Sequence, residues 1–561
     1  MEARFFVLSP EHGMLIRGCS VLVLGSGIWN LESGICDLGI DTFRCNGLSH
    51  LNKGLCVFSS KWFSLFSAAM LATTVSSPIS AAQNVILIIG DGMDDQQITM
   101  ARNYLHGAEG ALTLDSMPAR SAVQVITRAS EPPFKPIYVA DSANSATAIA
   151  TGVTTSRGRI STSVEDADLR LISQDLKEAG YAVGIVSTAS VTDATPAVFM
   201  ANISRRFCEN PGAMQGEQGR GLFTADCPED LISNGGKGSI SEQIARSPVD
   251  LVLGGGMKHF EPLSESGQQT VLDLARSQGF RILETLDDIA AVQAELNNST
   301  TEAQVSEANR SSGEGALSSP SATGSAAADE SRLQVSSSLR LLGLFTPSTM
   351  PVRWISSSGE AAQYPEPSIL NHVHEYLGEV ELPEPVRCEP NAAYGATPPL
   401  ARMTELALAQ LSQRSEKGFF LMVESASIDK QSHARRPCGQ IGELAQLEES
   451  LQLALAFAEQ SPGTVVLVTA DHGQAAQIIP DGSMFAGYGI PVYTPGQLQR
   501  VITPEGSVMA MNYATNEFQA EEHTGVNVPL FGNEAAAPFM PPFLQQSDLH
   551  GLILSTFGLS E

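Results

Sequence analysis

The sequence is short of positive charge. It contains 33 lysine and arginine residues against 61 aspartate and glutamate residues, which gives a formal net charge of −28 at pH 7. A surface with this excess of negative charge repels nucleic acid and anionic membranes. We therefore expect no nucleic-acid-binding surface. Any positive charge that binds an anionic ligand must be local, such as a bound metal ion or a single arginine.

The sequence also lacks a convincing membrane anchor near its start. The apolar stretch in Lys61–Ala72 is shorter than the ~20 residues that a spanning helix needs, although an anchor is the alternative interpretation. A lysine, a short apolar run and the small residues Ser80–Ala82 are typical of a cleaved secretory signal, which we expect from about residue 53 to 82. Residues 1–50 precede this signal, so we expect that the translation start was placed too early and that residues 1–82 are spurious or cleaved.

Cysteine is scarce as well, with 8 in 561 residues. Half of them would leave with the predicted leader. Those that remain are an even set, consistent with two disulfide bonds in an oxidising compartment, and by arithmetic they allow three pairings. Zinc binding is the rival use, but no two of them form a Cys-x2-Cys pair. The remaining residues are Cys208, Cys227, Cys388 and Cys438.

Continuous apolar runs alternate with helical patterns along the rest of the chain. Val85–Ile89 is such a run and ends at Gly-Asp-Gly, and residues 182–186, 419–423 and 465–468 are similar. These runs predict strands that are buried on both faces. Between them, Ile441–Phe457 carries apolar residues at helical spacing. The alternation predicts an α/β fold with a mainly parallel central sheet and helices on both faces.

One segment has too few large apolar side chains to fold. Residues from about 297 to 338 are dominated by Ser, Ala, Gly, Glu and Thr. Such a composition cannot bury enough apolar surface, so we expect a disordered surface insertion. The length would allow two or three domains, but α/β enzymes of this size often form one domain with insertions. We expect a single domain over residues 83–561.

Polar residues follow the predicted strands. Asp91, Glu424 and Asp471 each lie just past the carboxyl end of an apolar run, and Thr195 lies a short loop beyond another. Open α/β sheets bind ligands at the carboxyl edge of their strands, so these residues are expected to meet at one site. The alternative for each acid is a helix N-cap.

A candidate nucleophile lies in Asp141–Ala148. Ser142 precedes small helix-forming residues, so it is expected at a helix N-terminus, where backbone N–H groups favour anions, although an N-cap is the alternative. A serine hydroxyl needs a base or a metal to become a nucleophile. Metal-ligand types recur at Asp429-x3-His433, Asp471-His472 and His523. A hydroxyl surrounded by cations is suited to phosphate-ester hydrolysis.

These motifs resemble the alkaline phosphatases, closely the bacterial periplasmic kind. The resemblance runs from about residue 84 to 559. It implies metal-dependent hydrolysis of small phosphate monoesters through a phosphoserine intermediate, by a homodimer that is periplasmic or secreted. The ordered blocks that carry it are residues 89–93, 139–148, 418–433, 464–472 and 523–525.

The resemblance also implies a role for each site residue. Ser142 would be the nucleophile, and Arg206 would bind two phosphate oxygens, with the adjacent Arg205 as an alternative. The implied cofactors are two Zn²⁺ and one Mg²⁺. The ligands would be Asp429, His433 and His523 for the first zinc, Asp91, Asp471 and His472 for the second, and Asp91, Thr195 and Glu424 for magnesium. Beside the magnesium would lie Asp193 and Lys430, and the implied disulfides are Cys208–Cys227 and Cys388–Cys438.

Positions beside the ligands differ from those relatives, which bears on rate, metal affinity and pH optimum. Two other functions remain in view. Another member of the same superfamily, a phosphodiesterase, sulfatase-like hydrolase or phosphomutase, is one, but the residues after Ser142 lack the Cys/Ser-x-Pro-x-Arg context of sulfatases. A non-catalytic envelope protein that binds phosphate or metal is the other, and it would lack a ligand or the nucleophile. The differing positions are Asp94, Ser425, Ser432, Gly473 and Gln474.

Overall fold

The computed structural model describes residues 82–216, 226–311, 339–374, 377–482 and 496–559, together with residues 484, 485 and 488. The predicted leader, apart from Ala82, lies outside the described residues, and so do residues 312–338 of the predicted insertion. Among the described residues, no helix is both long enough and apolar enough to cross a membrane.

A 10-stranded sheet forms the centre of the fold, in the order β21-β2-β20-β14-β1-β13-β5-β6-β8-β7. The seven strands from β14 to β7 are parallel to their neighbours, whereas β20 is antiparallel to both β14 and β2. The prediction of a mainly parallel sheet is therefore confirmed. The strands are β1 Asn84–Gly90, β2 Ala119–Gln124, β5 Ala182–Ser190, β6 Leu251–Gly255, β7 Phe280–Leu283, β8 Arg340–Leu344, β13 Phe419–Ser425, β14 Val465–Ala470, β20 Val528–Gly532 and β21 Phe543–Gln545.

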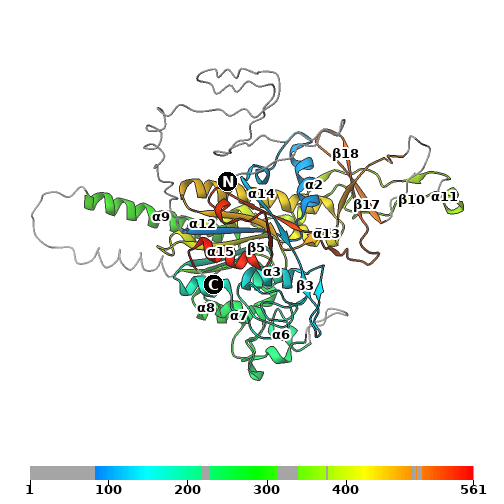
Figure 1. Cartoon of the computed structure of the whole chain (residues 1–561). Coiled ribbons are helices and arrows are strands. Elements are labelled where there is room, and N and C mark those ends of the chain that lie inside the picture. Colours follow the sequence, from blue (N-terminus) through cyan, green and yellow to red (C-terminus); the bar gives the residue numbers. More distant parts are fainter. Residues whose placement is uncertain are drawn as a thin grey trace, which may run out of the picture. The chain divides into compact units, whose positions relative to one another are not determined.

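The central strands are apolar because helices cover both faces of the sheet. Every residue of β1, β13 and β14 is buried. Helix α14 packs against both α12 and α2, and these three helices form one group. Helices α3 and α15 pack against each other and form a second group. Figure 1 shows the two groups on opposite sides of the sheet. The helices are α2 Asp95–His106, α3 Ser142–Thr151, α4 Ile172–Glu178, α5 Ala194–Ala197, α6 Pro211–Met214, α7 Ile240–Arg246, α8 Val271–Ser277, α9 Leu286–Ser311, α11 Ile369–Val373, α12 Leu400–Ser412, α13 Ser427–His433, α14 Pro437–Gln460 and α15 Asp548–Thr556.

Smaller sheets lie outside the central one. Strands β16, β18 and β17 form an antiparallel group of three, and four pairs, β3–β4, β9–β12, β10–β11 and β15–β19, are also antiparallel. Their bounds are β3 Thr127–Arg128, β4 Pro136–Ile137, β9 Trp354–Ser356, β10 Glu366–Pro367, β11 Val380–Glu381, β12 Cys388–Pro390, β15 Gly473–Gln474, β16 Gln477–Ile479, β17 Gln497–Ile502, β18 Val508–Tyr513 and β19 His523–Thr524.

Helix α9 differs from the expectation for the insertion. It continues to Ser311, so the first part of the segment that composition marks as disordered is helical. The physical reason is that residues 297–311 include Ala, Glu and Gln, whose high helix propensity does not depend on large apolar side chains.

Candidate active site

The carboxyl edge of the sheet gathers the predicted acidic residues. Asp91 follows β1 and Asp471 follows β14, and the register pairs Ile89 with both Glu424 and Thr469 on either side. Parallel neighbours end at one edge, so these side chains meet although they are far apart in sequence. Glu424 lies within β13, one residue before its end, rather than after the strand as predicted. The pairing of β13 with β1 extends past the apolar run, since Ser425 still pairs with Gly90.

Ser142 occupies the first turn of α3. The N-cap is Asp141, whose side chain accepts from the backbone N of Asn144, so the N-cap alternative for Ser142 does not hold. The Ser142 hydroxyl is buried and lies 3.1 Å from His472 Nε2 and 3.5 Å from Asp91 Oδ1. The hydroxyl is thus aimed at two of the predicted metal ligands.

The first predicted zinc cluster forms between α13 and β19. Asp429 and His433 are one helical turn apart, and His433 Nε2 lies 3.3 Å from Asp429 Oδ2. His523 Nε2 lies 3.4 Å from Asp429 Oδ1 and 3.1 Å from His433 Nε2. Asp429 and His433 are therefore more than a pair on one helix, because His523 from a distant strand joins them.

The protonation of this cluster fits a bound cation. His433 Nδ1 donates to Glu521 O, and His523 Nδ1 donates to Ala140 O at 2.8 Å. Since a carbonyl oxygen only accepts, each Nδ1 carries the proton and each Nε2 of a neutral ring offers a lone pair. Two lone pairs and a carboxylate that converge within 4.8 Å repel one another unless positive charge lies between them. Without a metal, a proton would supply this positive charge: burial alone would lower the pKa of His523, but the carboxylate of Asp429 outweighs it and raises that pKa to about 8.

The second predicted zinc cluster adjoins the first. His472 Nε2 lies 3.4 Å from both Asp91 Oδ1 and Asp471 Oδ2. Asp471 Oδ1 accepts from the backbone N of Gly92 and of His472, whereas its buried Oδ2 has no hydrogen-bond donor in the described part of the chain. Burial, together with the charges of Asp471 and Asp429, raises the pKa of Asp91 well above its usual value. A bound cation would satisfy the unpaired Asp471 Oδ2 and would offset the repulsion between the Asp91 and Asp471 carboxylates.

The third predicted group consists of oxygen atoms alone. Asp91, Glu424 and Thr195 lie on or just beyond β1, β13 and β5, which are adjacent in the sheet. The Thr195 hydroxyl is buried and finds no hydrogen-bond partner among the described residues. Burial raises the pKa of Glu424 to about 8, although its Oε2 accepts from Ser187. Carboxylate and hydroxyl oxygens suit a small hard cation such as Mg²⁺.

Asp193 joins the two basic residues of the site. It accepts from Lys430 Nζ at 2.5 Å and from Arg206 Nη2 at 2.9 Å. Burial favours a raised pKa for Asp193, but the charges of Lys430 and Arg206 outweigh it and hold that pKa well below its usual value. Arg206 Nη1 also reaches Asp141 Oδ2 at 3.3 Å, beside Ser142, whereas Arg205 is exposed. The geometry therefore favours Arg206 over Arg205 as the arginine of the site.

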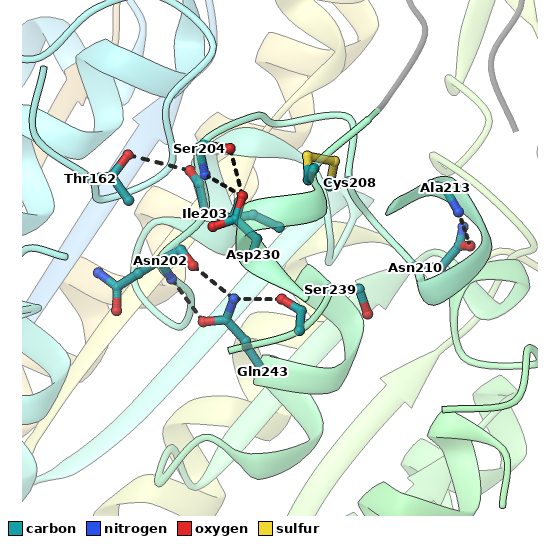
Figure 2. The surroundings of a disulfide bond; sticks show 12 residues. Thr162, Asn202, Ile203, Ser204, Cys208, Asn210, Ala213, Asp230, Ser239 and Gln243 are labelled. Carbon is teal, nitrogen blue, oxygen red and sulfur yellow. Dashed lines mark hydrogen bonds between the residues drawn. A yellow bond between two sulfur atoms is a disulfide. The ribbon is translucent and has the colours of Figure 1, made fainter. Parts of the chain in front are cut away.

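A disulfide holds the loop that carries Arg206. Cys208 is bonded to Cys227, with a Cα–Cα distance of 6.6 Å. On the other side of Arg206, the Ser204 hydroxyl donates to Asp230 at 2.5 Å, and Figure 2 shows this contact beside the disulfide. The loop is thus fastened at both ends to the segment 227–230. The other implied pair, Cys388–Cys438, is also bonded, with a Cα–Cα distance of 5.2 Å.

Some contacts of the site were not found by reading the sequence. Gln474 was noted as a departure beside a ligand, and its Nε2 donates to Asp429 Oδ1 at 2.6 Å. Asp141 holds Arg206, and Ser187 holds Glu424. No local motif signals such pairs, because their members lie on different elements of the fold.

The described geometry can be compared with known proteins. The sequence profile of the alkaline phosphatase family matches residues 82–312 and 325–548. The chain is 36% identical over 484 residues to the alkaline phosphatase of Escherichia coli. The aligned region covers 85% of this chain and 86% of that protein. The solved alkaline phosphatase of the Antarctic bacterium TAB5 shares the fold at a TM-score of 0.55 and 18% identity, over 86% of this chain and 100% of that one. A solved mutant of the TAB5 enzyme has Mg bound in its M3 site, at a TM-score of 0.53 and 18% identity over 86% of this chain and 99% of that one. On these matches the chain belongs to the alkaline phosphatase family and is a phosphatase.

Proposed function

We propose that the protein hydrolyses phosphate monoesters through a phosphoserine on Ser142, with two Zn²⁺ and one Mg²⁺ as cofactors. The observation that carries this proposal is the position of the Ser142 hydroxyl. It lies 3.1 Å from His472 Nε2, at the N-terminus of α3. The N-cap residue of that helix, Asp141, contacts Arg206. This position supports the proposal because the proposed nucleophile, the proposed metal ligands and the proposed phosphate-binding arginine lie around one point.

The residues of the chain divide the reaction into two displacements. In the first, Ser142 Oγ attacks phosphorus, the Oγ–P bond forms and the bond to the leaving alkoxide breaks, so the Ser142 proton is released and the alkoxide takes up a proton. In the second, water attacks the phosphoserine, releases inorganic phosphate and returns the hydroxyl. Arg206 binds two non-bridging oxygens in both steps, because its planar guanidinium matches two oxygens at once.

Metal ions bound at the three ligand clusters would supply the positive charge that activates the nucleophile and stabilises the leaving group. Bound zinc would lower the pKa of the attacking serine and water and stabilise the leaving oxygen. Asp429, His433 and His523 would hold one zinc, and Asp91, Asp471 and His472 the other. Asp91, Thr195 and Glu424 would hold magnesium, with Asp193 and Lys430 beside it.

We also infer export and dimerisation. The proposed location is the periplasm or the medium after cleavage near Ala82, and the proposed assembly is a homodimer. The two disulfides support an oxidising compartment. We take residues 83–561 as one domain that carries the insertion. Sequencing the amino terminus of the exported protein tests the processing, and a terminus at Met1 would contradict it.

The decisive experiment combines a metal analysis of the purified protein with turnover of two substrates. We expect about two zinc and one magnesium per chain, and turnover of p-nitrophenyl phosphate that exceeds that of bis-p-nitrophenyl phosphate at least ~100-fold. The reason is that a monoester has three non-bridging oxygens, two for Arg206 and a third for a further cation, whereas a diester has only two and carries a second ester group in place of the third. Preference for the diester would support a phosphodiesterase, and metal-loaded protein without turnover would support a binding protein.

A further inference from the structure

Arg435 follows α13 and is buried although it carries a charge. Its φ angle is 56°, in the left-handed region that favours glycine after a helix. Its side chain is 5% exposed and donates from Nε to Glu521 Oε2 at 2.5 Å, and the Glu521 side chain is 0% exposed. An arginine in a backbone conformation that suits glycine indicates that the side chain has a task at this position.

The rest of the guanidinium holds the segment between β18 and β19. Arg435 Nη2 donates to Phe518 O at 2.9 Å and to Asn516 Oδ1 at 3.2 Å. Glu521 is tied from the other side, because its Oε1 accepts from the backbone N of Thr515 at 2.6 Å. The segment contains neither helix nor strand, so these side-chain contacts determine its path.

That path brings the backbone of Glu521 against His433. Glu521 N donates to His433 O at 3.0 Å, and His433 Nδ1 donates to Glu521 O. The second contact keeps the proton on Nδ1 and turns the Nε2 lone pair toward Asp429 Oδ2, 3.3 Å away. The same segment leads directly into His523, so both imidazoles of the cluster depend on it.

We propose that the buried Arg435–Glu521 pair positions the Asp429–His433–His523 centre and thereby sets its affinity for zinc. This inference rests on the proposed function, which takes that cluster to be a zinc site. The pair acts through the backbone and does not touch substrate. Asp471 is held instead by the backbone N of Gly92 and by the side chain of Gln546, which donates to its carbonyl oxygen, so the two zinc sites should respond differently.

The test is a calorimetric titration of the demetallated full chain with zinc alone. We expect two classes of zinc site in the wild type. Glu521→Gln leaves the guanidinium without its counter-charge, and Arg435→Lys cannot reach the carbonyl and amide oxygens together. Either change should weaken one class about 10- to 100-fold, the usual effect of losing a group that orients a ligand, and leave the other within about 2-fold. Excess zinc should restore most of kcat.

Arg435→Gly separates backbone from side chain. Glycine suits the left-handed φ angle, so this variant relieves backbone strain while it removes the ion pair. A weakened zinc class in a folded Arg435→Gly protein would support positioning by the side chain. The matched control is Arg414→Gln, which breaks a buried pair with Asp250 (Nε–Oδ1 2.8 Å) at the start of β6, the opposite edge of the sheet. The control should lose stability and keep both zinc affinities.

The possible outcomes distinguish a failure of the proposed zinc sites from a failure of the proposed role of the Arg435–Glu521 pair. If the wild type shows no zinc class, the metal chemistry of the proposed function is wrong and this inference falls with it. If the wild type shows two classes and the folded variants match it, the inference alone is wrong. Should Glu521→Gln fail to fold, Arg435→Lys and Arg435→Gly decide.

Discussion

At the scale of single residues, position determines what Ser142 can do. Nothing in its own chemistry distinguishes it from Ser145 one turn later, whose hydroxyl donates to the backbone oxygen of Asp141. The Ser142 hydroxyl instead faces His472 and Asp91. A buried hydroxyl among unsatisfied ligand atoms is activated when a cation binds, whereas one that donates to its own helix is not.

Ser142→Ala should therefore separate binding from chemistry. Because the hydroxyl is not among the proposed protein ligands, we expect the variant to keep its metals and lose at least roughly 100-fold in kcat. Rapid-quench labelling of the wild type at mildly acidic pH should trap phosphate on Ser142. Ser145→Ala is the matched control and should keep its activity. Label on another residue, or normal turnover by Ser142→Ala, would refute the assignment.

The pair Asp193 and Lys430 is expected to determine which metal occupies the third site. Imidazole suits zinc better than magnesium, so Asp193→His combined with Lys430→His should weaken Mg²⁺ activation and raise the zinc content of that site. Loss of a cation near phosphate should also move the pH optimum upward. Metal analysis and pH–rate profiles check this. An unchanged Mg²⁺ dependence would show that Asp193 and Lys430 do not border the site of Asp91, Thr195 and Glu424.

At the scale of elements, the site consists of strand ends and of loops whose positions depend on contacts outside the central sheet. The strand ends are fixed by the register of the sheet, in which Ile89 lies between Glu424 and Thr469. The loop that carries Arg206 lies outside the sheet and depends on the Cys208–Cys227 bond and on Asp230. We therefore expect the loop to be more sensitive than the strands to local changes.

Removal of this disulfide should act on substrate binding as well as on stability. Its sequence separation of 19 residues predicts a loss of about 3 kcal/mol on the chain-entropy account. Cys208→Ser with Cys227→Ser should also raise KM for p-nitrophenyl phosphate several-fold, because Arg206 is less firmly placed. Cys388→Ser with Cys438→Ser removes the other bond and should lower stability with less effect on KM. Equal changes in KM for the two double variants would contradict a specific role for the Arg206 loop.

At the scale of the whole molecule, a strongly acidic chain buries several carboxyl groups. Glu443 on α14 is an example outside the proposed ligand set. It accepts from Thr188 Oγ1 at 3.1 Å and from Gln446 Nε2 at 2.8 Å, and burial raises its pKa to about 7. Between about pH 4.5 and about pH 7, the folded protein therefore holds a proton that the unfolded chain has released.

The sign of this linkage predicts how stability changes with pH. A raised carboxyl pKa contributes stability that is complete below the unfolded pKa and is lost as pH rises through about 7. Glu443→Gln should remove up to roughly 3 kcal/mol of the decline in unfolding free energy between pH 4.5 and 8. Denaturant unfolding of the metal-free proteins across that range measures it, with the exposed Glu459→Gln of the same helix as control. A Glu443→Gln protein with the wild-type pH dependence would show that Glu443 is ionised in the fold.

The class of fold and the family could be predicted from the order of the residues. The run Val85–Ile89 and its counterparts are apolar throughout, and such runs are stable only between two layers of helix, so a mainly parallel sheet followed from local composition. The ordered blocks with Asp91, Ser142, Asp429 and His472 were sufficient to indicate an alkaline phosphatase. The metal and substrate roles of these residues stay predictions.

Which side chains meet, and which contacts hold them, became clear from the folded chain. The buried Arg435–Glu521 pair spans 86 positions and the Gln474–Asp429 contact spans 45, and neither leaves a periodic or local signal. Composition alone also missed the continuation of α9 to Ser311, because a shortage of large apolar residues does not exclude local helix propensity. Strand and helix patterns arise from neighbours a few residues apart, whereas the geometry of the site arises from contacts between distant elements, which become defined when the chain packs.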